Sequence, residues 1–144
     1  MANQQNYQNH TRWFPLFHFI LMPLLLVLMI WTAVCVFMEF EWWRLQLLLL
    51  TIALVVSSFA ARLQALKAQD RLIRLEESIR YDRVLPFGLA AEAKGLRLGH
   101  IVALRFSSDE ELADLVARTI RGEFGSTKEI KLAIKNWRAD HVRV

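Results

Sequence analysis

FILMPLLLVLMIWTAVCVFM, residues 19–38, is a run of twenty residues without a charge, and LQLLLLTIALVVSSFAA, residues 45–61, is a second run of seventeen. Between them lies only the short segment EFEWWR, residues 39–44. A bilayer core of about 30 Å needs about 20 helical residues, so each run can cross once and the pair is too long for one crossing. The sequence therefore predicts a transmembrane helical hairpin with spans of about residues 15–38 and 42–61.

Positive charge lies on the outer flanks of the two runs. Arg12 precedes the first run, and several Lys and Arg residues follow the second, starting at Arg62 and Lys67. The segment between the runs carries two Glu residues against the single Arg44. Because cytoplasmic flanks of membrane helices are enriched in Lys and Arg, we expect both termini to be cytoplasmic.

The chain divides into four parts by composition. Residues 1–12 form a polar segment, residues 13–61 the hairpin, residues 62–85 a cytoplasmic helical stalk, and residues 86–144 a small helical cytoplasmic domain. Pro23 lies inside the first span, where its missing N–H should kink the helix. No segment alternates like a β-strand, so the predicted fold class is all-α.

The second run continues into the stalk without a helix-breaking residue until Pro86. We therefore expect one helix from about Trp42 to about Tyr81. An a/d heptad row extends over two heptads of it, which is short of the three or four that indicate a coiled coil. We expect this row to pack against the protein's own C-terminal domain, with dimerisation as the alternative. The row consists of Ala65, Ala68, Leu72, Leu75 and Ile79.

Residues 86–144 predict three helices after a loop that contains one helical turn at Leu89 to Lys94. The first helix covers His100 to Phe106 and is apolar. The second begins with a capping box, formed by Ser107 with Glu110 or Ser108 with Glu111. Its apolar face is formed by Leu112, Leu115, Val116, Thr119 and Ile120. The third begins with a capping box of Ser126 and Glu129, and its apolar face is formed by Ile130, Ala133, Ile134 and Trp137.

A basic stripe is the most specific surface feature of the last predicted helix. Lys128, Lys131, Lys135 and Arg138 recur at i, i+3, i+7 and i+10, opposite the apolar face. We expect these side chains to contact phosphates of anionic lipid headgroups, where each cation can contribute about 1 kcal/mol. Simple solvation of a polar face is one alternative. Binding of DNA in the manner of a helix-turn-helix is another, although Lys side chains suit phosphates better than base edges.

Small residues recur every four positions in the second run, at Ala53, Ser57 and Ala61. Such a row lets another helix approach closely in lipid, where packing replaces the hydrophobic effect between helices. We expect association with another membrane protein or a second copy of this chain. The first span of the same chain is an equal alternative occupant.

Histidines and acidic residues give little sign of a cofactor. His10, Arg12 and His18 form a possible interfacial polar site, but haem ligation between the spans would need a second copy, because the second run contains no His. The acidic residues from Asp109 to Asp114 fit compensation of a helix dipole better than a cation site. Cys35 is the only cysteine, which excludes an intrachain disulfide. We expect no cofactor and no metal.

The predicted function class is a non-enzymatic accessory or adaptor subunit. No nucleophile–base pair, metal-ligand set or phosphate-binding loop is present in the sequence. No ionisable side chain lies inside either run, which argues against transport. Two alternatives remain open: a membrane-tethered nucleic-acid or regulatory binding protein, and an oligomeric haem-binding or transport protein.

Three stretches resemble one known family. They are NYQNHTR with the following PLFHF, residues 6–12 and 15–19; IVALRFSSDEE, residues 101–111; and the C-terminal stretch from Lys131, which includes KNWRADH at residues 135–141. Together they resemble a bacterial family of small two-span membrane proteins classed as a domain of unknown function. The resemblance implies a bacterial inner-membrane location and supplies no activity or catalytic residues.

Overall fold

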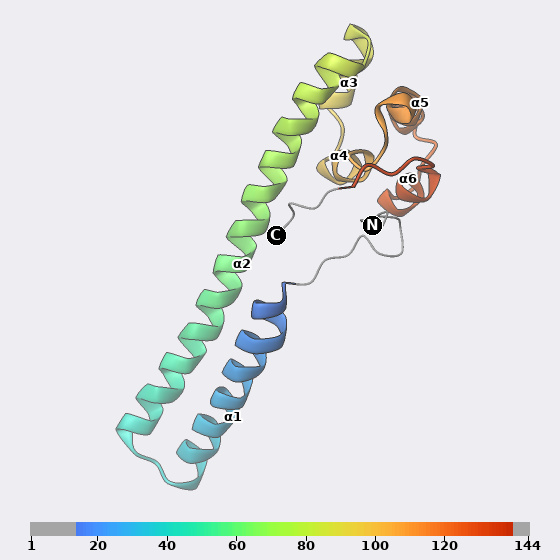
Figure 1. Ribbon diagram of the computed structural model, residues 1–144. Helices are drawn as coiled ribbons and strands as arrows, with labels where there is room; N and C mark the ends of the chain where they lie inside the picture. Colours follow the sequence, from blue (N-terminus) through green and yellow to red (C-terminus); the bar gives the residue numbers. More distant parts are fainter. Residues whose placement is uncertain (1–13, 140–144) are drawn as a thin grey trace. The chain divides into compact units, whose positions relative to one another are not determined.

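The computed structural model describes residues 14–139, which form helices and no β-sheet (Figure 1). The predicted all-α class is thereby confirmed. Residues 1–13 and 140–144, with His10 and Arg12 among them, lie outside the described part. The elements are η1 (Leu16–Leu21, a π-helix), α1 (Met22–Met38), α2 (Trp42–Val84), α3 (Phe87–Lys94), α4 (Leu98–Leu104), α5 (Asp109–Ile120) and α6 (Thr127–Ala133).

The chain separates into two compact units, which divide between Leu66 and Lys67 within α2. The first unit is a helical hairpin of η1, α1 and the N-terminal part of α2. Its two helices, Leu16–Met38 and Trp42–Val84, are each long and apolar enough to cross a membrane. Only 11% of the most apolar window of the first helix and 6% of that of the second are buried. Neither apolar window is therefore packed inside the protein.

An irregular stretch marks the position where a kink was expected. Pro23 lies in the first turn of α1, and the preceding η1 is wound as a π-helix. The Met22 N–H donates to the carbonyl of Phe17, five residues back instead of four. A proline ring crowds the carbonyl four residues before it, and a π-turn is one way for a helix to absorb that disturbance.

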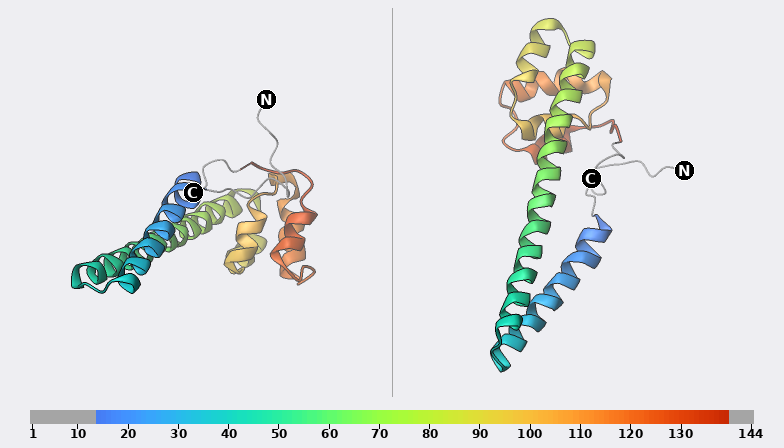
Figure 2. Two further views of the ribbon diagram at one scale, coloured as in Figure 1. Left: turned by 90° about the horizontal axis from the view of Figure 1, so that it is seen from below. Right: turned by 90° about the vertical axis from the view of Figure 1, so that its left-hand side faces the viewer.

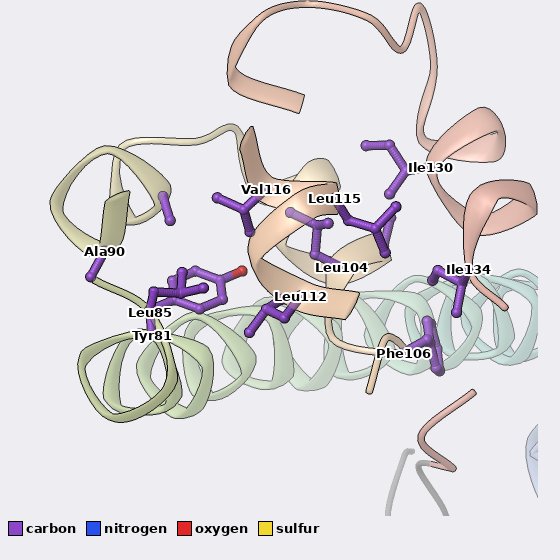
Figure 3. Packing of buried hydrophobic residues seen from close by; sticks show 12 residues of the cluster. Tyr81, Leu85, Ala90, Leu104, Phe106, Leu112, Leu115, Val116, Ile130 and Ile134 are labelled. Carbon is purple, nitrogen blue, oxygen red and sulfur yellow. The ribbon is translucent and has the colours of Figure 1, made fainter. Parts of the chain in front are cut away.

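The second unit is a small helical domain in which the stalk takes part. Two further views show α3 to α6 gathered along the C-terminal part of α2 (Figure 2). One apolar core joins α2 to the other four helices (Figure 3). It is formed by Tyr81, Leu85, Ala90, Ala93, Ala103, Leu104, Phe106, Leu112, Leu115, Val116, Ile130 and Ile134.

The predicted single helix from Trp42 into the stalk is confirmed, and it continues to Val84. The domain after it differs in one helix from the expected three. Residues 87–94, expected to hold one helical turn in a loop, form the eight-residue helix α3. Ala90 and Ala93 of α3 are buried in the core, so apolar packing supports a helix that Gly88 within it and Gly95 at its end obscured in the sequence.

The heptad row of the stalk does not pack against the domain, and that expectation was wrong. Leu72, Leu75 and Ile79 are 54%, 58% and 63% exposed. The domain covers another side of the same helix, where Ile73 and Tyr81 are buried. The side of α2 that is buried is therefore the one that carries the aromatic ring of Tyr81, and not the one with the most regular apolar spacing.

The two predicted capping boxes differ in outcome. At the start of α6, the Glu129 N–H donates to Ser126 Oγ, and the Glu129 carboxylate accepts from the Gly125 N–H at 2.8 Å. At the start of α5, Ser108 is the N-cap residue, but its side chain makes no capping hydrogen bond. The predicted apolar face of α5 is present, with Leu112, Leu115, Val116 and Thr119 buried.

Candidate functional site

Arg80 lies at the centre of a buried ionic network in the second unit. It comes from the domain-facing side of α2 and is only 3% exposed. Its Nη1 lies 3.1 Å from Glu77 Oε2, one turn back on the same helix. Its Nε donates to Asp109 Oδ1 at 2.7 Å, and its Nη2 donates to the carbonyl of Ser107 at 2.7 Å. One guanidinium therefore joins the stalk to the start of α5.

Glu77 is the least accessible acid of this network, with 4% of its surface exposed. Burial raises the pKa of its carboxyl above the usual 4.5, although Arg80 and Arg138 act in the opposite direction. Arg138 approaches from the far end of the domain, with its Nη1 3.5 Å from Glu77 Oε1. A carboxylate removed from water is held here by two guanidinium groups, and losing either cation would leave it poorly compensated.

Asp109 lies at the exposed rim of the network. The hydrogen bond from Arg80 lowers the pKa of its carboxyl below the usual 3.8. Asp109 is also the first residue of α5, where an anion faces the positive end of the helix dipole.

Tyr81 follows Arg80 on α2, with its ring fully buried and its hydroxyl without a hydrogen-bond partner among residues 14–139. Burial raises the pKa of the Tyr81 hydroxyl, so it stays protonated.

A short extended segment after α6 closes the domain. Ser107 and Trp137 form an isolated antiparallel bridge, and the Arg138 N–H donates to the carbonyl of Phe106 at 2.7 Å. The ring centroids of Phe106 and Trp137 lie 5.2 Å apart. Glu111, expected to cap α5, instead accepts hydrogen bonds at 3.1 Å from the N–H groups of residues 135 and 136.

This segment breaks up the predicted basic stripe. Helix α6 ends at Ala133, and Ile134 is extended, so Lys135 and Arg138 do not continue its face. Lys128 and Lys135 are exposed, whereas Lys131 is half-buried with its Nζ 5.6 Å from the centroid of the Phe106 ring. Arg138 pairs with Glu77. Two of the four side chains are thus surface cations, Lys131 is half-buried against Phe106, and Arg138 is exposed but paired with Glu77.

The small-residue row of α2 lies open in the first unit. Ala53, Ser57 and Ala61 are all exposed. Ser57 and Ala61 line an apolar cleft of about 440 Å³ together with Phe14 and Phe17, where η1 faces α2. Thr51, off this row, is buried instead. Association of another helix with the row stays a prediction.

His18, the described member of the expected interfacial polar site, has a local role in the structure. Its Nδ1 donates to the carbonyl of Phe14 at 3.0 Å, and its ring packs edge-on against Phe17. Among residues 14–139, no group of three His, Cys, Asp or Glu side chains is placed to hold a metal ion.

Comparison with known proteins shows which family the chain belongs to. A family model described as a family of unknown function, DUF6526, matches residues 1–144. The chain belongs to the DUF6526 family. No curated protein and no solved structure matches it. The three stretches that carried the resemblance lie inside the matched range.

The sequence reasoning missed the ionic network of this DUF6526 member. Neither Glu77 nor Arg80 was assigned a role from the sequence, and Asp109 was interpreted as dipole compensation alone. One signal was available: Ile73, Glu77, Arg80, Tyr81 and Val84 share one helical face at i, i+4, i+7, i+8 and i+11. Two charges set between apolar and aromatic residues on one face indicate a buried pair.

Proposed function

We propose that this protein is a two-span integral membrane protein of the bacterial inner membrane, with both termini cytoplasmic, that works as a non-enzymatic adaptor or accessory subunit. In this role the hairpin anchors the chain, and the helical domain presents a binding surface to partners. The observation that carries the proposal is the composition of α2, which is apolar and exposed at one end and part of a folded domain at the other.

Polar side chains within the apolar runs support the anchoring role. Thr51 and Ser58 each donate a hydrogen bond at 2.8 Å to the carbonyl four residues earlier. Thr32 does the same at 2.9 Å. A hydroxyl bonded to its own helix needs no water, which suits a helix surrounded by lipid.

The short turn between α1 and α2 also fits this proposal. Arg44 donates to the carboxylate of Glu39 at 2.7 Å and to the Glu39 carbonyl at 2.9 Å. The one cation of the turn is therefore neutralised locally. The charge that orients the chain is then left to the Lys and Arg residues of the two outer flanks.

Attachment of the domain through the helix itself supports an adaptor over a tethered enzyme. The Arg80 network and Tyr81 make the C-terminal part of α2 a component of the domain core. An adaptor must hold its partner at a defined position and in a defined orientation. The exposed Lys128 and Lys135 add cationic groups that can contact anionic lipid phosphates.

Topology provides the first test. Reporter fusions after Glu41 and after Val144 should give signals from opposite compartments, with Glu41 outside and Val144 in the cytoplasm. Alkaline extraction of membranes should leave the full chain in the pellet. The same signal from both fusions, or release by alkali, would overturn the proposal.

Partner identification provides the second test. Purification of the full chain in mild detergent, followed by mass spectrometry, should recover a stoichiometric membrane subunit or a second copy of the chain. A variant with Ser57→Ile and Ala61→Ile should lose a partner that binds the small-residue row. A chain that purifies alone as a monomer would contradict the adaptor role.

Lipid contact by the basic residues has its own measurement. Hydrogen exchange of residues 127–138 in the full chain should be slower in nanodiscs of anionic lipid than in zwitterionic ones. The difference should shrink as salt rises, because screening weakens exposed charge pairs. Lys128→Gln with Lys135→Gln should abolish it, and an unchanged difference would refute the contact.

A further inference from the structure

The heptad row of the stalk is an exposed apolar face of the second unit, with Leu72, Leu75 and Ile79 each more than half exposed. We propose that two copies of this protein pair along this row, as a parallel, two-stranded helical contact between their stalks. The row used here is Ala68, Leu72, Leu75 and Ile79. The inference rests on the membrane insertion proposed above and names the second copy as the partner.

The domain leaves this row free because it covers a different side of the helix. At about 100° per residue, the centre of the row lies roughly 140° around α2 from the buried face of Ile73, Glu77 and Arg80. Leu72, Leu75 and Ile79 each remain more than half exposed with the domain folded. A second helix can therefore dock on the row without displacing any contact of the domain.

The residue types at the row suit two strands. Leu72 and Ile79 occupy a positions, and Ala68 and Leu75 occupy d positions. Ile79 at a with Leu75 at d matches the pattern of a β-branched residue at a and Leu at d that favours parallel dimers over higher oligomers, whereas Ala68 and Leu72 do not add to that preference. The row is short, so confinement of both copies to one membrane must raise their effective concentration for the contact to form.

Flanking charges select the parallel arrangement. In a parallel pair, a g position faces the e position of the next heptad of the partner helix. This places the exposed Arg71, at g, beside Glu76, at e, of the other copy, twice by symmetry. An antiparallel pair would bring e against e and g against g, which sets like charges together. Two copies inserted with the same topology can only meet in the parallel sense.

Site-specific cross-linking tests the contact, since Cys35 is the only cysteine of the chain. In a Cys35→Ser background, Leu75→Cys and Ile79→Cys should each form a disulfide-linked dimer in native membranes under mild oxidation. A disulfide requires Cα atoms about 4.4–6.8 Å apart, so it reports close pairing. Lys67→Cys, exposed but off the row, is the matched control and should cross-link at least tenfold less. Equal cross-linking at Lys67 and Leu75, or none at both row positions, would overturn the proposal.

Charge reversal gives an independent readout that leaves the apolar row intact. Arg71→Glu alone and Glu76→Arg alone should each reduce the Leu75→Cys cross-link severalfold, and the double variant should restore it. Failure of the double variant to restore it would contradict the parallel register. Cross-linking without opposite-compartment fusion signals would refute the proposed topology and leave the pairing standing. The reverse result would refute only the pairing.

Discussion

The two ends of α2 invert the usual rule of burial. In residues 42–61 the apolar side chains are exposed and the only charge is at Arg44. Farther along the same helix, Glu77 and Arg80 are almost fully buried, whereas Leu72 and Leu75 are exposed. One continuous helix thus has two opposite patterns of burial.

The difference shows how each part is held together. The hairpin hides little surface within the chain, so its stability under the proposed function comes from lipid and from internal backbone hydrogen bonds. The domain relies on a protein core and on paired charges, whose removal from water is costly unless every partner is present. Damage to the ionic network should therefore harm the domain and spare the hairpin.

The largest expected effect comes from Arg80→Met. This change leaves Glu77 buried and deprives the Ser107 carbonyl of its donor, and breaking a buried pair in this way costs about 3–5 kcal/mol. Urea unfolding of the full chain in mild detergent, followed by pulse proteolysis of the domain, would measure the loss. The hairpin should remain protected at the same urea concentration, because it contains no part of the network.

Two further variants sharpen this result. Arg83→Met removes an exposed cation of the same stalk and should change the unfolding free energy by less than about 0.5 kcal/mol. Glu77→Leu added to Arg80→Met should recover at least half of the loss, because an apolar pair replaces an unpaired charge. Equal effects of Arg80→Met and Arg83→Met would show that the network contributes nothing.

Tyr81 tests the apolar side of the domain core. Tyr81→Ala should cost about 3 kcal/mol or more, because it opens a large cavity among Leu85, Leu112 and their neighbours. Tyr81→Phe should be neutral or stabilising, since the hydroxyl is buried without a hydrogen-bond partner. Denaturation of both variants in the same detergent gives the comparison. A clear loss for Tyr81→Phe would reveal a partner for the hydroxyl.

Stability of the domain should depend on pH in two opposing ways. Asp109 has a lowered pKa in the folded domain, so its contribution is present above about 3.8 and is lost as pH falls below that value. Glu77 has a raised pKa, so the unfolded chain ionises first and stability falls as pH rises above about 4.5. Asp109→Asn should reduce the loss of stability below about pH 3.8. Glu77→Gln should reduce the loss of stability above about pH 4.5. Unfolding midpoints between pH 3 and pH 7 would show this, and parallel profiles for all three proteins would contradict it.

The smallest expected effects separate the four basic residues near the C-terminus. Lys131→Gln should cost about 0.5–1 kcal/mol, because it removes a cation from the face of Phe106. Lys128→Gln and Lys135→Gln should each change stability by less than that, since both side chains are exposed. Thermal unfolding of the three single variants in one detergent would rank them. Equal losses would mean that the cation–π contact has no energetic weight.

Elements with strong local signals were predictable from the sequence. Two long uncharged runs, the absence of helix breakers before Pro86, and the Ser126–Glu129 box led to the right helices. The apolar face of α5 was also clear, because Leu112 to Thr119 keep a regular helical spacing. In each case the deciding residues are close in sequence, so local propensity and packing agree.

Features that depend on long-range contacts were not predictable in the same way. After α6 ends at Ala133, backbone N–H groups donate to the Phe106 carbonyl and to the Glu111 carboxylate, which lie more than twenty residues earlier. The pairing of Arg80 depends on α5, which places Asp109 beside it although the two residues lie 29 positions apart in the sequence. The heptad row has the most regular apolar spacing in the stalk, yet the core formed on a less regular face of the same helix.

The extended segment from Ile134 to Arg138 has a consequence for the order of events during synthesis. It covers Phe106 and supplies the last contact to Glu77, so the domain core is incomplete until this segment has been translated. The apolar runs emerge about 75 residues earlier, which at 5–20 residues per second gives a lead of roughly 4–15 s. Under the proposed topology, the nascent chain would enter the membrane first and fold its domain afterwards, already anchored beside other copies made from the same message.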